Sequence, residues 1–439
     1  MAVHVINESR RCLQCKKPLC RLQGCPVQTN VPEMIRLFLD GKINEAGAML
    51  YDNNPMSVFC SLVCDHDAQC EGHCIQGRRG APIQISSIEH YISDTYLDKL
   101  VLERKSYNGH NVAVIGAGRI GHVHARTIAG HPQADLALVC DPVGDAAEKL
   151  ASQYDGARSA KDAEEAFADP QVDAVIIGSP TPLHIPHLLA AAKAGKAVLC
   201  EKPIALDMAD VEAARTDLDA ISTPVMFGFN RRFDPSFAAV RAAVEAGRIG
   251  ALEQLTVISR DPAAPPIEYV TVSGGIFRDM TIHDFDTARF FLGDITEVHA
   301  VGQNLDPAIE EAGDFDAAVV TLRAASGAVA TIINNRHCAS GYDQRLEASG
   351  HDGALFAENI RPTTVRLSNA EVTDAQEPYL DFFLERYADA YRLELSAFIE
   401  AVEAGTTPPT GIGDAVAALR LAEAATRSAM TGEVVRLGS

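Results

Sequence analysis

The chain has 439 residues, of which 47% are hydrophobic and 22% charged, a composition typical of a soluble globular protein. Its length predicts about three domains at roughly 150 residues each, and no apolar stretch approaches the roughly 20 residues that a membrane-spanning helix requires. Because the formal net charge of -21 would also repel phosphate backbones, we expect neither a membrane nor a nucleic acid as a partner.

The N-terminal segment is marked by its cysteines. Eight of the eleven cysteines fall between Cys12 and Cys74, in the pattern C-x2-C-x4-C-x4-C and, after a helical stretch, C-x3-C-x5-C-x3-C. A disulfide scaffold needs an oxidising compartment, but the opening MAVHVINESRRC has no apolar core of the signal-peptide type, so we expect a cytoplasmic protein. Zinc is chemically possible, although structural zinc sites more often show paired CxxC knuckles. Clustered cysteines with mixed short spacings favour iron–sulfur clusters.

The sequence changes character after the cysteines. A helix is expected around Ile88 to Leu102, then a polar linker over residues 103–110, and a new domain starts near Asn111. From there short apolar runs alternate with Ala-rich helical stretches, which predicts a doubly wound parallel sheet. Its expected strands are Val112–Ile115, Leu136–Cys140, Ala174–Gly178 and Ala197–Cys200.

The first of these strands leads into a glycine-rich loop. Gly116, Gly118 and Gly121 open a helix, where only glycine lets the backbone approach a pyrophosphate and where the free amides attract it. Asp141 ends the next strand, 20 residues after Gly121, where a carboxylate can accept hydrogen bonds from ribose hydroxyls. Because that charge would repel a 2′-phosphate, we expect NAD rather than NADP. The alternative is a glycine turn in an α/β unit that binds no nucleotide.

Beyond about Asp234 the apolar pattern has a period of two. The runs Leu255–Ile258, Ala317–Leu322 and Ala328–Ile333 predict a mostly antiparallel sheet, and a final helix is expected near Asp414 to Met430. The expected fold class is therefore α/β, with a Rossmann-type parallel sheet and an α+β domain preceded by a small α-helical domain. The expected boundaries are 1–108 for the iron–sulfur domain and linker, 109–233 for the NAD-binding domain, and 234–439 for the substrate-binding and oligomerisation domain.

Two further segments contain residues suited to alcohol oxidation. Lys202 lies at the carboxyl end of a predicted strand, where ligands of open α/β sheets bind. A helix from about Phe277 would place Asp279 and His283 on one face, close enough to touch. The imidazole suits a base for the hydroxyl proton, the carboxylate would hold its tautomer, and the lysine would donate to the reacting oxygen. Considered alone, the same residues could equally be a surface pair and a snorkelling lysine.

These motifs together resemble the Gfo/Idh/MocA family of sugar oxidoreductases, from about Asn111 to the C-terminus. The resemblance to inositol 2-dehydrogenases is carried by Gly228–Pro235, Ser259–Pro262, Pro265–Tyr269, Ser273–Arg289 and Gly341–Arg345. It implies NAD-dependent oxidation of myo-inositol, or of a related polyol or sugar, to a ketone. It also implies a homodimer or homotetramer built on the second-domain sheet.

The resemblance assigns roles to residues. It implies that Lys202, Asp279 and His283 are the catalytic set. It implies contacts with the cofactor at Gly116, Gly118, Arg119, Ile120, Gly121, Asp141, Thr181, His184 and Lys202, and with the substrate at Arg231 and Tyr342. One departure is Ser340, where an aromatic residue is usual, and it leaves the exact substrate open.

The cysteine segment resembles the N-terminal iron–sulfur domain of glutamate synthase small subunits and dihydropyrimidine dehydrogenase. The likeness is carried by Arg11–Cys20, Gly24–Val27, Asn54–Pro55 and Cys70–Cys74. It implies two [4Fe–4S] clusters, one held by Cys12, Cys15, Cys20 and Cys74 and the other by Cys25, Cys64, Cys70 and Glu89, with Cys60 spare. The spacing from Cys20 to Cys25 is one residue longer than usual, and Asp65 stands where proline is common.

Two other functions stay open. A flavin domain follows the cysteine segment in those relatives, so the chain could be an electron-transfer subunit working with a flavoprotein, although no second nucleotide fingerprint follows Gly121. It could also be a non-catalytic sensor of NAD and a sugar, which the three catalytic candidates argue against. Hydride transfer moves two electrons whereas a cluster takes one, so the clusters would either brace the fold or serve a redox partner protein.

Overall fold

The computed structural model describes residues 2–97 and 109–438, and the chain divides into two units, Met1–Tyr107 and Asn108–Ser439. The boundary expected at 108, most of the linker at 103–110, and the last residues of the helix expected up to Leu102 lie outside the described residues. None of the described helices combines the length and apolarity that a membrane crossing requires.

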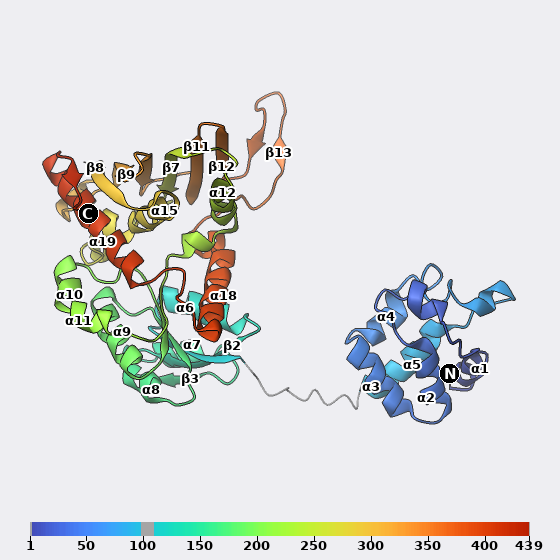
Figure 1. Cartoon of the computed structure of the whole chain (residues 1–439). Coiled ribbons are helices and arrows are strands. Elements are labelled where there is room, and N and C mark those ends of the chain that lie inside the picture. Colours follow the sequence, from blue (N-terminus) through green and yellow to red (C-terminus); the bar gives the residue numbers. More distant parts are fainter. Residues whose placement is uncertain (1, 98–108, 439) are drawn as a thin grey trace. The chain divides into compact units, whose positions relative to one another are not determined.

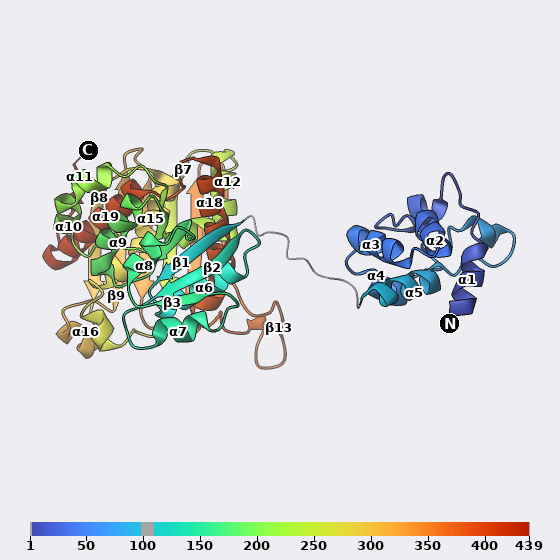
Figure 2. The ribbon, with the colours of Figure 1, turned by 90° about the horizontal axis from the view of Figure 1, so that it is seen from below.

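The first unit is helical, as predicted. Its helices are α1 (Ala2–Arg10), α2 (Val31–Leu39), α3 (Ile43–Asn53), α4 (Ser57–Val63) and α5 (Ile85–Leu97), with a π-helical turn η1 (Cys20–Gly24) and a 3-10 turn η2 (Ile75–Arg78). In α5 the apolar residues Ile85, Ile88 and Ile92 recur at the spacing that places them on one face. That face is buried with Met34 and Ile35 of α2, and α4 lies alongside α5 (Figure 2).

The second unit begins with a parallel sheet of six strands in the order β3-β2-β1-β4-β5-β6. The strands are β1 (His110–Ile115), β2 (Ala134–Cys140), β3 (Arg158–Ala160), β4 (Ala174–Ile177), β5 (Ala197–Cys200) and β6 (Val225–Phe227). Their connecting helices are α6 (Arg119–Ala129), α7 (Ala146–Ala151), α8 (Ala163–Ala168), α9 (His184–Lys193), α10 (Met208–Ala213) and α11 (Arg215–Asp219). This strand order reverses between β1 and β4, which is the place where such sheets bind ligands. The doubly wound sheet is therefore confirmed.

A mixed sheet of seven strands follows, in the order β12-β11-β7-β10-β9-β8-β15. The strands are β7 (Leu252–Arg260), β8 (Ile295–Gln303), β9 (Ala317–Ala324), β10 (Val329–Asn335), β11 (Asp343–Gly350), β12 (Gly353–Ala357) and β15 (Val435–Arg436). The β7–β10 pair is parallel and the other pairs are antiparallel, so the prediction of a mostly antiparallel sheet is confirmed. Along β9 buried residues alternate with exposed ones, which is the period of two seen in the sequence.

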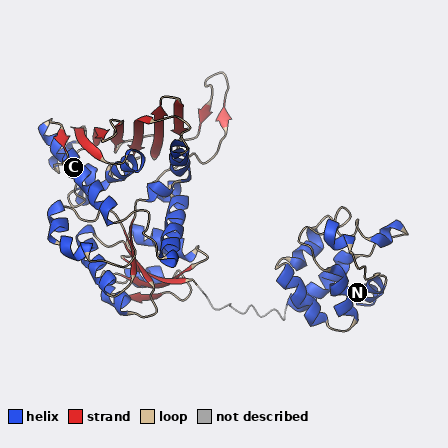
Figure 3. Cartoon of the chain, in the orientation of Figure 1, coloured by secondary structure: helices blue, strands red, loops and turns tan. Residues whose placement is uncertain are grey.

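Helices cover the face of this sheet that is turned toward the parallel sheet (Figure 3). The shorter elements of this half are α12 (Pro235–Glu245), α13 (Ile267–Val270), α14 (Ile276–Asp279), α15 (Ile282–Leu292), α16 (Pro307–Glu311) and α17 (Phe383–Arg386). Two 3-10 turns precede them along the chain, η3 (Thr181–Leu183) after β4 and η4 (Asn230–Phe233) after β6. A hairpin of β13 (Arg366–Leu367) and β14 (Ala375–Gln376) projects from the unit (Figure 1).

Two long C-terminal helices pack onto the parallel sheet, and the second of them also packs onto the mixed sheet. α18 (Ala388–Ala404) returns to the parallel sheet and packs Leu395 into its core. α19 (Ile412–Thr431) contributes Leu419 to the core of the parallel sheet and Leu421 to the core of the mixed sheet. The two domains expected on either side of residue 234 therefore share one helix, and the position of their boundary stays a prediction.

Candidate active site

The glycine loop between β1 and α6 has the shape that a bound pyrophosphate needs. A Cβ on Gly116, which has a φ of 105°, would lie 2.5 Å from the carbonyl oxygen of Gly178, so no larger residue fits there. A Cβ on Gly121 would lie 2.0 Å from the carbonyl oxygen of Gly116. Gly118, in contrast, faces open space and precedes the first turn of α6, where no side chain of the described residues caps the amides. The loop thus packs tightly on one side and leaves free N–H groups on the other.

Asp141 lies directly after β2 and is hydrogen-bonded to this loop. Its carboxylate accepts from the amide of Ala117 at 2.7 Å and from the amide of Val143 at 2.8 Å. The side chain is half-buried, so it keeps lone pairs for a ligand. One carboxylate therefore both fixes the glycine loop and offers acceptors to a ribose.

The other expected cofactor residues surround the loop. Arg119 is exposed at the start of α6, with its guanidinium 5.5 Å from the ring centre of Phe382. Ile120 contacts Gly178, where an added Cβ would lie 3.0 Å from its methyl group. Thr181 is half-buried in η3, at the carboxyl end of β4. Their contacts with a cofactor stay predictions.

His184 is buried between two loops. Its Nδ1 lies 2.7 Å from the carbonyl oxygen of Pro203 and its Nε2 lies 2.8 Å from that of Ser179. Burial lowers the pKa of His184, and a neutral imidazole can donate to one of these carbonyls. The ring therefore braces the loop after β4 against the loop that contains Lys202, while its expected contact with the cofactor stays a prediction.

Lys202 and Asp279 meet at the carboxyl end of β5. The ammonium of Lys202 donates to the backbone carbonyl of Asp279 at 2.6 Å and lies 3.8 Å from carboxylate oxygen Oδ1. The hydroxyl of Tyr269 donates to the same Oδ1 at 3.0 Å. The structure thus brings together two catalytic candidates from different halves of the unit.

The helix expected through Asp279 and His283 is interrupted. α14 ends at Asp279 and α15 begins at Ile282, and the hydroxyl of Thr281 between them lies 3.2 Å from the carbonyl of Ile276 and 2.7 Å from Oδ1 of Asn334. Among the described residues no hydrogen bond or ion pair joins Asp279 to His283. The expected contact between the pair therefore does not occur in this structure, although both residues remain catalytic candidates.

The imidazole of His283 is neutral at neutral pH. Burial lowers its pKa well below the usual value, and the positive charges of Lys202 and Arg231 lower it further. Nδ1 is buried and has no hydrogen-bond partner within the described part of the chain, which leaves Nε2 as the nitrogen that can reach a ligand. The ring of Phe229 packs at right angles to it, with centroids 6.3 Å apart. A half-buried neutral imidazole of this kind can act as a proton acceptor.

A buried polar network that the sequence did not predict lies behind His283. Arg231 donates to the hydroxyl of Ser259 at 2.8 Å and pairs with the carboxylate of Asp284. The side chain of Asn334 donates to the other oxygen of Asp284 at 2.8 Å. The sequence gives no clear sign of this network, because α15 also contains the polar residues Asp286, Thr287 and Arg289. The network holds Arg231 in place. The expected contact of Arg231 with the substrate stays a prediction.

Tyr342, the second expected substrate residue, is 6% exposed. Its ring packs edge-on against Phe382 and Tyr387, with centroids 6.1 Å and 6.0 Å apart. Burial raises the pKa of its hydroxyl well above the usual value, so the group stays protonated and can donate a hydrogen bond.

Asp261, at the end of β7, is a carboxyl group that sequence reasoning missed. Burial and the negative charge of Asp279 raise its pKa to about 7, although Arg231 and Arg336 partly offset this. A carboxyl group with this pKa exists in both protonation states at neutral pH and can exchange a proton with a ligand. The segment Ser259–Pro262 was singled out for its resemblance alone, and the sequence gives no sign of this titration.

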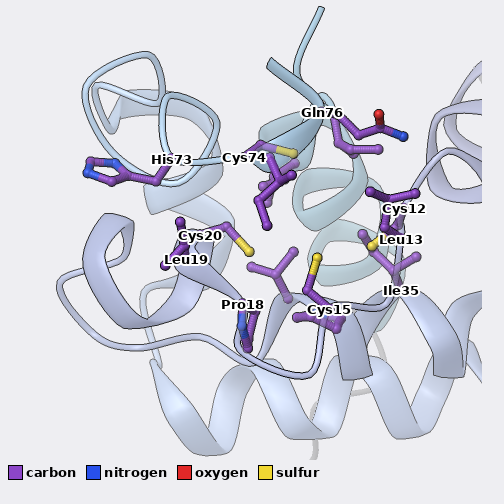
Figure 4. Close-up of a pocket in the computed structure, with 15 residues that line it drawn as sticks. Cys12, Leu13, Cys15, Pro18, Leu19, Cys20, Ile35, His73, Cys74 and Gln76 are labelled. Atoms are coloured by element: carbon purple, nitrogen blue, oxygen red, sulfur yellow. The ribbon is translucent and has the colours of Figure 1, made fainter. Parts of the chain in front are cut away.

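In the first unit, four of the expected cluster ligands line one pocket. Figure 4 shows Cys12, Cys15, Cys20 and Cys74 around a common hollow, which Pro18 also lines. Burial raises the pKa of Cys20 to about 12, and the neighbouring thiol of Cys74 adds to the shift. Thiols that share a partly buried hollow ionise with difficulty unless a cation is present, which is the chemistry of a thiolate-ligated cluster. The donor set therefore fits an iron–sulfur cluster.

Two of the other expected ligands, Cys64 and Cys70, are influenced by the charge of Glu89. Burial raises the pKa of Cys64, and Cys60, Glu89 and Cys25 contribute to the shift. Burial also raises the pKa of Cys70 to about 12, with Glu89 and Cys25 among its neighbours. Glu89 is buried and accepts a hydrogen bond from the hydroxyl of Ser57 at 2.7 Å. Within the described residues, no group of three or more His, Cys, Asp or Glu side chains is drawn together closely enough to form a metal site.

The doubly wound sheet with its open glycine loop, together with the lysine, carboxylate and imidazole beside it, defines a nucleotide-dependent oxidoreductase. The family described as "Oxidoreductase family, NAD-binding Rossmann fold" matches residues 110–229, and the "GFO/IDH/MocA C-terminal domain" matches residues 237–356. The chain belongs to the Gfo/Idh/MocA oxidoreductase family. A third family, "Dihydroprymidine dehydrogenase domain II, 4Fe-4S cluster", matches residues 2–100.

Named relatives cover the second unit. "Inositol 2-dehydrogenase" of Rhizobium meliloti is 47% identical over 72% of this chain and 95% of its own length. "Myo-inositol 2-dehydrogenase" of Thermotoga maritima is 44% identical over 74% of this chain and 98% of its own. The crystal structure of a myo-inositol dehydrogenase from Corynebacterium glutamicum is 49% identical and covers 75% of this chain and 99% of its own, with a TM-score of 0.73.

Proposed function

We propose that the second unit oxidises a secondary hydroxyl of myo-inositol, or of a related polyol or sugar, to a ketone with NAD. The observation that carries the proposal is the neutral, half-buried imidazole of His283, whose pKa is lowered by burial and by the charge of Lys202. The names of the relatives support the substrate class. A structure of scyllo-inositol dehydrogenase from Lactobacillus casei with bound NAD(H) and scyllo-inositol, 28% identical with a TM-score of 0.69, supports the cofactor.

In this proposal the dinucleotide lies on the glycine loop, with the free amides of α6 at its pyrophosphate and Asp141 at its ribose. When bound, NAD supplies the acceptor for the hydride that leaves the hydroxyl-bearing carbon. Nε2 of His283 takes the hydroxyl proton and later releases it to water. Lys202, anchored by its hydrogen bond to the carbonyl of Asp279, donates to the oxygen as negative charge develops there. Arg231 and Tyr342 contact the remaining hydroxyls.

The test is a panel of cyclitols and aldoses with NAD, followed as absorbance at 340 nm under anaerobic conditions. We expect turnover with at least one cyclitol and a loss of about 100-fold or more in kcat/KM for His283→Gln. His351→Gln is the matched control, because that side chain is 83% exposed. If no member of the panel is oxidised, the dehydrogenase proposal fails and a non-catalytic sensor remains.

We further propose that the first unit holds two [4Fe–4S] clusters. Cys12, Cys15, Cys20 and Cys74 would hold one, and the shared hollow of these four thiols supports this. Cys25, Cys64, Cys70 and Glu89 would hold the other. Such clusters, when bound, supply one-electron transfer. Iron and sulfide analysis with electron paramagnetic resonance of the reduced protein tests the assignment, and flavin absorbance in the purified protein would favour the electron-transfer subunit instead.

Two properties complete the proposal. Thiolate-ligated clusters need a reducing compartment, so we place the protein in the cytoplasm. We also propose a homodimer or homotetramer built on the mixed sheet, which size-exclusion chromatography with light scattering tests. A single-copy mass in solution would contradict it.

A further inference from the structure

A buried ion pair spans the short helix that ends in Asp279. The carboxylate of Asp314 accepts a hydrogen bond from the amide of Ile276, the first residue of α14, at 2.8 Å. Its other oxygen pairs with Nη1 of Arg336 at 2.8 Å. Gly275 makes this approach possible, because a Cβ there would lie 2.8 Å from the Asp314 carboxylate. Asp314 therefore fixes the beginning of α14 to Arg336.

Arg336 also reaches the end of the same helix. Its second terminal nitrogen, Nη2, lies 3.6 Å from Oδ2 of Asp279 and makes no hydrogen bond within the described residues. Arg336 is wholly buried, and burying a guanidinium costs free energy unless carboxylates surround it. Asp314, Asp279 and the nearby Asp261 supply that negative charge. A buried, planar guanidinium that contacts two carboxylates holds both of them in a defined geometry.

The two oxygens of Asp279 consequently face different groups. Oδ1 accepts from Tyr269 and faces Lys202, whereas Oδ2 faces Arg336. This arrangement turns the carboxylate toward Lys202 and explains why, among the described residues, no hydrogen bond joins it to His283.

We propose that Arg336 and Asp314 are positioning residues for the catalytic pair, which hold the Asp279 carboxylate against Lys202. The inference rests on the proposed function, in which Lys202 donates to the reacting oxygen. Within the described residues, the ion pairs of Arg336 are with Asp279 and Asp314, so we expect its effect on Lys202 to pass through Asp279.

A double-mutant cycle tests this. Arg336→Gln is expected to lower kcat by about tenfold or more in the otherwise unaltered protein, with the Kd for NAD unchanged. In an Asp279→Asn background the same substitution is expected to lower kcat by less than about twofold, because the group it positions is gone. Arg336→Lys, which keeps the charge, is expected to recover part of the loss. Arg323→Gln, in an exposed pair with Glu297 at 3.1 Å, is the matched control and leaves kcat unchanged.

Equal losses in both backgrounds would show that Arg336 supports only the fold, and would overturn the proposal. If Arg336→Gln does not fold because Asp314 is left unpaired, the Arg336→Gln/Asp314→Asn double substitution removes both charges and enters the same cycle. If the protein oxidises no polyol, the proposed function fails. The coupling between Arg336 and Asp279 can still be measured from the thermal stabilities of the unaltered protein, the two single variants and the double variant. Additive stability effects would then overturn the proposed positioning, and a coupled pair would support it.

Discussion

Substitution of Asp141 should change which dinucleotide the protein uses. The side chain has two roles in the structure, since it accepts hydrogen bonds from Ala117 and Val143 and presents its free lone pairs at the end of β2. In Asp141→Ser, a bound ribose would lose charged hydrogen bonding worth about 1.5–3 kcal/mol in total, so the KM for NAD should rise about 10- to 100-fold.

The same substitution removes a charge repulsion. Two unit charges about 4 Å apart interact by about 4 kcal/mol at an effective dielectric constant of about 20, and exposure to solvent reduces this to about 1–2 kcal/mol for a half-buried side chain. Relief of that repulsion should raise kcat/KM for NADP about 5- to 30-fold. Together the two effects should lower the ratio of kcat/KM for NAD over NADP by about 50-fold or more.

The assay is initial-rate kinetics at 340 nm with each dinucleotide in turn, at a saturating concentration of the active polyol. Asp162→Ser is the control, because Asp162 also follows a strand of the same sheet but caps α8 through the amide of Glu164 at 3.2 Å. An unchanged ratio in a folded Asp141→Ser protein would refute the assignment of Asp141 to the ribose.

Three further predictions concern titration and metal content. The pKa of Asp261 is raised to about 7, so the pH profile of kcat/KM should bend near pH 7, and this bend should be lost in Asp261→Asn. A bend that persists in the variant would show that another group causes it. Burial and the charge of Glu201 raise the pKa of Glu394 well above its usual value, so the folded protein holds this proton more tightly than the unfolded chain and loses stability as the pH rises from the usual pKa to the raised one. As the pH rises above the usual range of a glutamate, the Tm should therefore fall more steeply in the unaltered protein than in Glu394→Gln, and parallel curves of Tm against pH would contradict this. Cys12→Ser should lower the iron content of the purified protein by about half. Cys140→Ser, in the parallel sheet, is the control and should leave the iron content unchanged. Equal iron contents in the two variants would argue against the first cluster.

The parallel sheet and the mixed sheet could be predicted because their sequence patterns reflect burial. β4 and β5 are buried along their whole length and read as unbroken apolar runs, whereas β9 is buried on one face and alternates. Such periodicities are local, so one sequence is enough to recognise them.

The contacts around Asp279 could not be predicted in this way. At the break between α14 and α15, the hydroxyl of Thr281 hydrogen-bonds to the side chain of Asn334, which lies far along the chain in β10. Arg336 and Asp314 likewise come from separate loops of the mixed sheet. No local pattern encodes a partner that only the folded topology brings near, and a charged residue such as Arg336 reads as an ordinary surface residue until its burial is known.

α19 has a consequence for how the second unit melts and how it responds to a ligand. The helix has 20 residues, about 30 Å of continuous backbone, and it packs into the cores of both sheets. Neither sheet can lose its packing without exposing apolar residues of the same helix, so the two should denature in one cooperative calorimetric transition. A dinucleotide that binds to the Rossmann half would then protect the amides of the mixed sheet from hydrogen exchange, at a distance from the bound molecule.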